Sequence, residues 1–388
     1  MKYLILILVV FIAGCGVQPK PVGLVSGAET ESTPTVQPNK KEVIKNSYIV
    51  EVKADLPANF LNQVGAKIKK RFTNVINAYQ LEMTPEQATR LAKHPNVISV
   101  EEEVVVTPTE VQENATWGLD RINQRELPLD TQFSYVGTGS NVTAYIIDSG
   151  INYTHTDFGG RASNAYDIIN DGTKDCSGHG THIAGTIGGT TYGIAKAVTL
   201  KGIKVACGSV GVGNYIAGLD WIAANNTGLA VANISATSTI ISKSWENAVN
   251  SLVRKNVTVV VSSGNNSMDA CATSPSHSTS AISVGAMGGS TSGTDIWWVG
   301  SNYGSCVDMV APGIAITSVG NSDDTGTAVK GGTSMAAPHV AGVAVLARQA
   351  NPSVAGKDII NLLVANATNN VITGVPAGTP NRLVYNNW

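Results

Sequence analysis

The chain has 388 residues, which is enough for one large domain and a small one. Its 26 lysines and arginines nearly balance its 28 aspartates and glutamates, and the formal net charge is −2. This balance argues against nucleic acid or an anionic membrane surface as the main partner. The 40 glycines suit a compact α/β protein with many tight loops.

The first fifteen residues have the features of an export signal. Lys2 precedes an apolar run over 4–13, which is too short to span a bilayer as a helix. The run ends in Ile-Ala-Gly-Cys at 12–15, which resembles a bacterial lipobox, in which the cysteine is lipidated and becomes the new N-terminus. We therefore predict a lipoprotein-type signal peptide over 1–15, with a lipid on Cys15 that anchors the precursor to a membrane. The alternative is an ordinary signal peptide in which this cysteine occurs by chance.

A linker and a small domain follow. Residues 16–45 are rich in Pro, Thr, Ser, Gly and Lys and predict a flexible linker. From residue 46 onward the pattern predicts a βαββαβ-like unit, with strands over 46–52, 76–83 and 96–106 and helices over 59–70 and 84–94. The second helix opens with Thr84 as N-cap, Pro85 at the first position and Gln87 at the third, which is a capping-box pattern.

Three segments of the remaining chain carry residues suited to acyl transfer. AYIIDSGI at 144–151 predicts a buried parallel strand ending at Asp148, and functional residues collect at the carboxyl ends of such strands. GHGTHIAG at 178–185 places His179 between two glycines at the start of a helix of small residues. GGTSMAAPHVAG at 331–342 places Ser334 at a helix start, where free N–H groups and the helix dipole favour a developing anion.

With these motifs in the order Asp, His, Ser, the chain resembles the subtilisin family of serine proteases, in its proteinase K-like branch and nearest to the aqualysin type. The segment WGLDRINQRELPLD at 117–130 is similar to the opening of the mature enzymes. The resemblance implies an α/β fold, subtilisin-like and doubly wound, with a mostly parallel sheet and helices on both faces. It also implies an α+β propeptide domain over 46–109, which assists folding and inhibits, and a peptidase domain over 110–388. The alternative for 46–107 is an accessory domain without an inhibitory role.

The function implied by the resemblance is that of an exported serine endopeptidase, made as a zymogen that cuts its own propeptide near Thr109–Glu110. Such an enzyme hydrolyses proteins and peptides without a catalytic cofactor, and it is monomeric and periplasmic or extracellular when mature. One alternative is a catalytically inactive surface lipoprotein that uses the fold for binding, although every triad position is filled. The other is a ligase or transamidase, and nothing in the sequence favours aminolysis over water.

In the family, the three motif residues form a catalytic triad. His179 would take the proton of Ser334 and later deliver it to the leaving amine, while Asp148 would orient the imidazole. An aspartate in an Asp-Ser-Gly turn also commonly caps the turn. His182 and His339 are the other histidines near these motifs, and we interpret both as structural. Asp157, Asp167 and Asp175 are alternative candidates for the role of Asp148.

The resemblance also points to an oxyanion hole and a substrate cleft. VVVSSGNN at 259–266 predicts a buried strand ending in Gly264 and Asn265. Asn265 matches the family's oxyanion-hole asparagine, with the Ser334 N–H as second donor; otherwise Asn265 is a turn residue. The residues that match the family's cleft are Ser235, Ala236, Thr237, Ser262, Ser263 and Gly264.

The cleft departs from the family pattern on both sides. Ala236, Thr237 and Ser238 replace Leu-Gly-Gly, and two serines replace Ala-Ala at 262–263. Side chains where glycine is usual should narrow the cleft. We therefore expect small residues such as Ala, Thr or Ser at P1, the position on the acyl side of the cleaved bond.

Four cysteines remain besides Cys15, and an even number in an exported chain suggests two disulfides with three possible connectivities. The resemblance implies the pairs Cys176–Cys207 and Cys271–Cys306. A metal site is the alternative, but no closely spaced pair supports it.

A structural calcium ion is also implied by the resemblance. Asp308 matches a side-chain ligand, and Thr279 and Ala281 match positions that give backbone carbonyls, a donor set that suits Ca²⁺. The alternative is that Asp308 only caps a loop.

Overall fold

The computed structural model describes residues 43–104, 106 and 109–388, and the predicted signal peptide with Cys15 lies outside this range. Two parts of the described chain, over 43–104 and 109–388, each have a hydrophobic core of their own. Among the helices of the described residues, none has the length and apolar character needed to cross a membrane.

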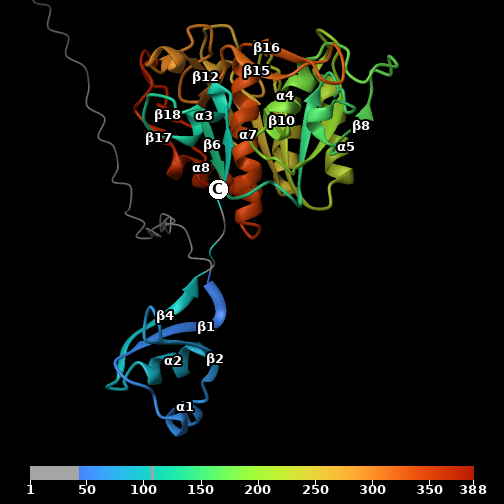
Figure 1. Ribbon diagram of the computed structural model, residues 1–388. Helices are drawn as coiled ribbons and strands as arrows, with labels where there is room; N and C mark the ends of the chain where they lie inside the picture. Colours follow the sequence, from blue (N-terminus) through green and yellow to red (C-terminus); the bar gives the residue numbers. More distant parts are fainter. Residues whose placement is uncertain (1–42, 105, 107–108) are drawn as a thin grey trace, which may run out of the picture. The chain divides into compact units, whose positions relative to one another are not determined.

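The small domain is a four-stranded antiparallel sheet with two helices on one face (Figure 1). The strand order is β2-β3-β1-β4, and the helices contribute Leu61 and Leu91 to a core that they share with the sheet residues Val50 and Leu81. The predicted βαββαβ order is therefore found. Its elements are β1 (Val43–Val52), α1 (Ala58–Val64), β2 (Lys67–Phe72), β3 (Ala78–Glu82), α2 (Pro85–Leu91) and β4 (Val97–Val104).

Two boundaries in this domain differ from the prediction. The helix expected over 59–70 ends at Val64, because Gly65 adopts a left-handed conformation (φ 80°) and residues 67–72 pair with β3 as strand β2. Strand β1 begins at Val43, so residues 43–45 belong to it and not to the linker. The capping box of α2 is present as expected, since the Gln87 N–H donates to Thr84 Oγ1 and the Thr84 N–H donates to Gln87 Oε1.

The large domain is built on a ten-stranded sheet with the order β17-β18-β14-β12-β11-β10-β7-β9-β8, and β13 pairs with β12. The pairs from β18 to β8 are parallel, whereas β17 and β13 are antiparallel to their neighbours. The strands are β7 (Val142–Asp148), β8 (Ala162–Asp167), β9 (Thr199–Lys204), β10 (Leu229–Ile234), β11 (Val257–Ser262), β12 (Ile282–Gly288), β13 (Ile296–Trp297), β14 (Met309–Pro312), β17 (Thr368–Asn369) and β18 (Arg382–Leu383).

Helices cover both faces of this sheet, as a doubly wound fold requires. Successive residues of β7 show the division: Ile146 packs in the core with α4 and α7, whereas Ile147 packs in the core with α5 and α6. The predicted fold class is thus correct. The helices are α3 (Trp117–Asn123), α4 (His179–Gly188), α5 (Val212–Asn225), α6 (Lys243–Arg254), α7 (Thr333–Ala350) and α8 (Ile359–Asn366), with short 3₁₀ helices η1 (Thr156–Phe158), η2 (Ala270–Ala272), η3 (Ser290–Ser292) and η4 (Gly356–Asp358).

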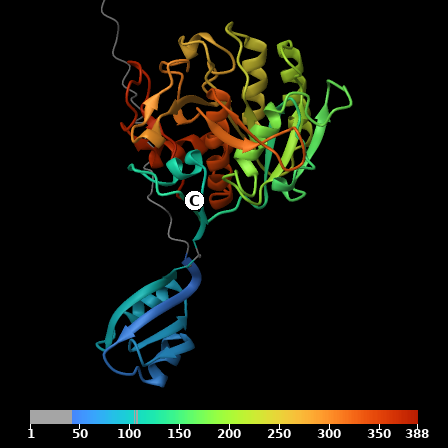
Figure 2. The ribbon, with the colours of Figure 1, turned by 45° about the horizontal axis from the view of Figure 1, so that its top comes forward.

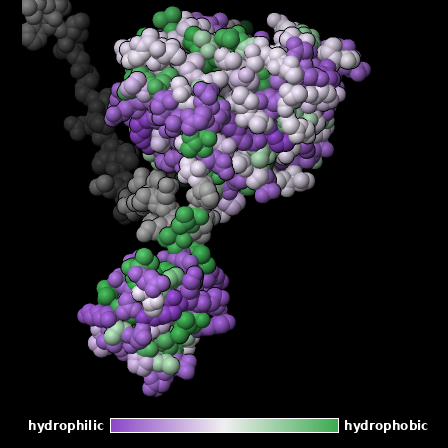
Figure 3. All heavy atoms as spheres, in the orientation of Figure 1, coloured by the Kyte–Doolittle hydropathy of each residue, from purple (hydrophilic) through white to green (hydrophobic). Residues whose placement is uncertain are grey.

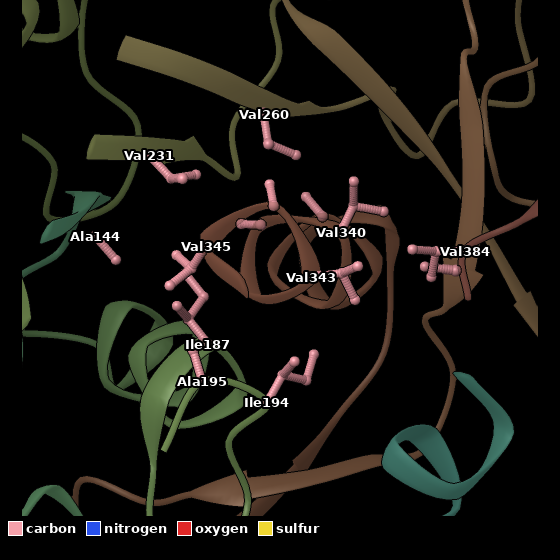
Figure 4. Close-up of a cluster of buried hydrophobic side chains, with 14 of the residues drawn as sticks. Ala144, Ile187, Ile194, Ala195, Val231, Val260, Val340, Val343, Val345 and Val384 are labelled. Carbon is pink, nitrogen blue, oxygen red and sulfur yellow. The ribbon is translucent and has the colours of Figure 1, made fainter. Parts of the chain in front are cut away.

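Helix α7 is buried along most of its length. Figure 4 shows Val340, Val343 and Val345 of this helix projecting between side chains from the sheet and from α4. Because valine and alanine side chains interlock here without exposure to water, the position of the helix is fixed by packing. The N-terminal end of α7 is thereby held firmly at the edge of the sheet.

Two hairpins complete the large domain: β5 (Glu110–Glu113) with β6 (Gln132–Tyr135), and β15 (Ile316–Val319) with β16 (Thr327–Lys330). Figure 2 shows the elements of this domain after a turn of 45°. The visible surface of the large domain is mostly hydrophilic or intermediate, whereas the visible face of the small domain mixes apolar and charged residues (Figure 3). The exposed large apolar residues of residues 43–106 are Val43, Ile44, Ile68, Val75, Ile76, Ile98, Val104 and Val106.

Candidate active site

The three motifs meet at the carboxyl edge of the parallel sheet. Asp148 is the last residue of β7, and Ser235 follows directly after the neighbouring strand β10, since Ile147 pairs with Ile234. Ser334, in the first turn of α7, contacts this edge through two bonds: its hydroxyl donates to the Ser235 carbonyl (3.2 Å), and the Ser235 hydroxyl donates to the Ser334 carbonyl (3.0 Å). The structure therefore places Ser334 of α7 beside the end of β10, next to the end of β7 that carries Asp148.

His179 is the first residue of α4 and bonds to Asp148. Its Nδ1 lies 2.9 Å from each carboxylate oxygen of Asp148. A Cβ at Gly180 would lie 2.2 Å from the Gly150 carbonyl oxygen, so only glycine lets α4 approach the turn after β7 this closely. The imidazole is 31% exposed and the Asp148 carboxylate 8%, so the pair is shielded on the aspartate side and open on the other.

The charge of Asp148 raises the pKa of His179, and burial of the imidazole opposes this shift. A carboxylate at Nδ1 also fixes the tautomer, because Nδ1 donates its proton to Asp148 and leaves Nε2 as an acceptor. This arrangement can accept a proton from an approaching hydroxyl.

The other two histidines of the motifs are bonded to the backbone. His182 Nε2 donates to the Ile316 and Ala328 carbonyls, and His339 Nδ1 donates to the Met335 carbonyl one turn earlier in α7. Burial lowers the pKa of each to about 4. Both are therefore neutral at ordinary pH and have roles in packing.

The Ser334 hydroxyl is hydrogen-bonded to the backbone of the neighbouring segment. Its proton is directed at the Ser235 carbonyl, and the described residues include no hydrogen bond between Ser334 and His179. A rotation about χ1 would redirect the hydroxyl, and such bonds often form only with substrate in place. Gly332, the N-cap, has φ 140° and ψ 173°, a conformation that essentially only glycine adopts, so the turn into α7 depends on it.

Asn265 is oriented by the start of the same helix. Its Oδ1 accepts from the Thr333 N–H (2.9 Å) and the Thr333 hydroxyl (2.7 Å). Because the carbonyl end of the amide is held in this way, the exposed NH₂ group is available to a ligand. Strand β11 ends at Ser262, two residues earlier than expected, since Gly264 has φ 107°.

Comparison with known proteins identifies the family. The model of the subtilase family matches residues 139–383, and that of the peptidase inhibitor I9 family matches residues 26–109. The chain belongs to the subtilase family. It is therefore a serine endopeptidase, and its N-terminal part is an inhibitor-type propeptide.

Individual relatives cover most of this subtilase. The extracellular serine proteinase of Thermus sp. (strain Rt41A) is 44% identical over 83% of this chain and 78% of its own length. The alkaline serine exoprotease A of Vibrio alginolyticus is 41% identical over 82% of this chain and 60% of its own. Among solved structures, the chain is similar to the crystal structure of a cold adapted subtilisin-like serine proteinase, with a TM-score of 0.66 and 43% sequence identity. The match covers 70% of this chain and 98% of that chain.

The four cysteines of the large domain form the two predicted disulfides, and the expected cleft residues lie beside Ser334. Disulfide bonds join Cys176 to Cys207 and Cys271 to Cys306, which is the pairing that the resemblance implied. The segments 235–238 and 262–264 follow the neighbouring strands β10 and β11 and flank the start of α7.

Asp308 lies away from the triad, beside the start of β12. Its Oδ2 accepts from the Ser283 N–H (2.8 Å), two residues after Ala281. Burial raises the pKa of Asp308 to about 6 despite the opposing charge of Arg382, and in the described part of the chain no salt bridge neutralises it.

A further residue, Asp175, was considered from sequence only as an alternative to Asp148. Its carboxylate does not contact His179. Instead it accepts from the Ser149 hydroxyl, the Thr181 hydroxyl and the backbone N–H groups of 177, 178 and 181, at 2.5 to 3.0 Å. Ser149 in turn accepts from the Gly180 N–H (3.0 Å). The buried Asp175 carboxylate thus joins Ser149, the residue after Asp148, to the first turn of α4. Its position shortly before the helix start is typical of a capping residue and could have predicted this role from the sequence.

We expect Asp175→Asn to lower kcat by about 10-fold to 100-fold with little change in KM, because small misplacement of a reacting group has effects of this size. The Asp175 charge also raises the pKa of His179, so the acidic limb of the pH–rate profile should move to lower pH.

Asp167→Asn is the matched control, because Asp167 lies before the same loop but bonds to the 169 and 170 N–H groups and to Lys204 (3.8 Å), and not to the first turn of α4. Equal effects of the two variants on kcat and on the pH profile would contradict a positioning role for Asp175.

Proposed function

We propose that this subtilase is an exported endopeptidase that hydrolyses proteins through Asp148, His179 and Ser334. The observation that carries the proposal is the paired Asp148 and His179 at one strand end, with Ser334 bonded at the next. The inactive binding protein is disfavoured because each of these positions holds a residue with the required chemistry.

The steps follow from the atoms available. Ser334 Oγ attacks the peptide carbonyl carbon while its proton passes to His179 Nε2, and the carbonyl oxygen becomes an oxyanion. Asn265 Nδ2 and the Ser334 N–H donate to that oxyanion. When the C–N bond breaks, His179 returns the proton to the leaving amine. Water then attacks the acyl-enzyme with His179 again as base, which releases the acid and restores Ser334.

The zymogen is organised in the proposed order of signal peptide (1–15), linker (16–45, of which 43–45 lie in β1), propeptide domain (46–109) and peptidase domain (110–388). The inhibitor match to residues 26–109 supports self-inhibition before cleavage near Thr109. A lipid on Cys15 would hold the precursor at the membrane, and the mature monomer would be released. The name of the Thermus relative, an extracellular serine proteinase, supports an extracellular destination.

A fluorophosphonate probe tests this function directly, because it reacts only with an activated serine. The mature protein should be labelled once, on Ser334, and should hydrolyse an unfolded protein such as casein. A folded protein that resists the probe would favour the binding alternative.

A structural calcium ion fits the surroundings of Asp308. The carboxylate is partly buried, and the residues described by the structure give it no salt-bridge partner. It is bonded to the segment whose carbonyls at Thr279 and Ala281 would complete an oxygen donor set. In the proposal these three residues hold the ion, which stabilises the fold and takes no part in the reaction.

Removal of calcium should therefore lower the melting temperature of the mature enzyme, since a ligand bound only to the folded state stabilises it by mass action. Differential scanning fluorimetry with and without a chelator measures the shift. In Asp308→Asn the difference between the two conditions should shrink. An unchanged melting temperature of the wild type at low free calcium would remove Asp308 from the ligand set.

A further inference from the structure

The space beside Ser334 is bounded by the two segments that follow β10 and β11. Ser334 is hydrogen-bonded to Ser235 of the first segment (235–238). Asn265, directly after the second segment (262–264), accepts a hydrogen bond from the Thr333 N–H. An acyl group on Ser334 Oγ with its oxygen at Asn265 Nδ2 must therefore lie across the gap between these segments. The side chain on the acyl side of the cleaved bond enters the same gap.

Thr237 spans this gap at Gly264. A Cβ built on Gly264 would lie 3.2 Å from Thr237 Oγ1 and 2.4 Å from Asn302 Nδ2. The Thr237 side chain therefore reaches the Gly264 backbone, and we expect it to limit the depth of the gap. With glycine in place of Thr237, the space of the hydroxyl and methyl groups would be open.

The two walls of the gap are tied to one buried segment over 274–276. On one side, Ser238 and Ser274 exchange backbone hydrogen bonds (2.7 and 3.1 Å). On the other, the Ser276 hydroxyl lies 3.2 Å from the carbonyls of Ser262 and Ser263. The Ser274 hydroxyl further donates to Glu246 of α6 (2.7 Å). Because the walls share this support, a bulky side chain cannot push them apart without breaking several hydrogen bonds.

We propose that Thr237 restricts the P1 residue of substrates to small side chains, namely Gly, Ala, Ser and Thr; this inference rests on the proposed function. The predicted propeptide junction agrees with it, since Thr109 would occupy P1 there.

The test uses the mature enzyme and four peptides that differ only at P1, with Ala, Thr, Leu or Phe. The wild type should cleave the Ala and Thr peptides with kcat/KM at least tens-fold above the Leu and Phe peptides. Thr237→Gly should raise the values for Leu and Phe about 10-fold to 100-fold, since differences of a methylene or more in a pocket have effects of this size. The value for Ala should change only a few-fold.

Thr239→Gly is the matched control, because it makes the same change two residues away at an exposed position and should leave the P1 profile unaltered. Thr237→Ser, which keeps the hydroxyl and removes only the methyl group, should give an intermediate widening and covers the case in which Thr237→Gly is unstable.

A wild-type profile dominated by Phe, Tyr or Leu would overturn the inference, and so would unchanged profiles in both Thr237 variants. Labelling of the wild type by the fluorophosphonate probe separates these outcomes from a failure of the proposed function. If labelling and hydrolysis are both absent, the function and the inference fall together.

Discussion

A Ser334→Ala variant is expected to remain a full-length precursor and to lose about 10⁶-fold in kcat, the effect measured for the nucleophile of subtilisin, a member of the same family. Alanine removes only the hydroxyl oxygen, and the buried length of α7 keeps the fold in place. The same hydroxyl is needed for cutting the propeptide, so both losses have one cause. Mass spectrometry of the protein produced in a protease-free host gives the length of the chain.

A trace of wild-type mature enzyme added to this precursor is the control. Cleavage near residue 109 in that mixture would show that the junction is intact and that only self-processing has been lost. If the variant instead matures on its own, then processing depends on a different protease or a different serine.

Asp148→Asn should leave the fold unchanged and lower kcat by about 10⁴-fold, the size known for the equivalent change in a trypsin-type triad. An amide can donate to Nδ1, which favours the wrong tautomer of His179. The precursor of this variant would be matured with wild-type enzyme, purified, and assayed against pH beside an Asp157→Asn control, whose carboxylate accepts from the backbone at Thr191.

The pH profile provides a second reading of the same variant. Catalysis needs neutral His179, so activity falls as the pH drops through the pKa of that histidine. Asp148 raises this pKa. Without the carboxylate the pKa falls, and the acidic limb of kcat/KM should shift to lower pH. Near-normal turnover with an unchanged acidic limb would contradict the orienting role of Asp148.

The sequence predicted elements well where the local signals agree. Strand β7 is a short apolar run before a glycine, and α2 carries a complete capping box, so both lie where expected. Strand β2 was missed because KIKKRF alternates in a way that also suits the exposed face of a helix. The left-handed Gly65 between α1 and β2 was the signal that separates the two elements.

At the site, sequence motifs identified the residues with reactive groups but not the bonds that support them. Asp148 and His179 were predicted together because their motifs, with that of Ser334, resemble the subtilisin family in sequence and order. The role of Asp175 and the contact of Ser235 with Ser334 come from chain crossings between distant segments, which no local pattern encodes. The contact of Thr237 with the Gly264 backbone also joins distant segments, although the departure of residues 236–238 from the family's Leu-Gly-Gly had already predicted a narrow cleft.

The Cys176–Cys207 bond joins the loop that leads into α4 to the segment after β9, three residues before His179. Disulfide bonds form and persist in oxidising compartments and are rare in a reducing cytosol. A crosslink over 31 residues contributes roughly 3–4 kcal/mol by the loop-entropy account. The loop that leads to His179 is therefore constrained in the folded enzyme by a covalent bond as well as by the hydrogen bonds of Asp175.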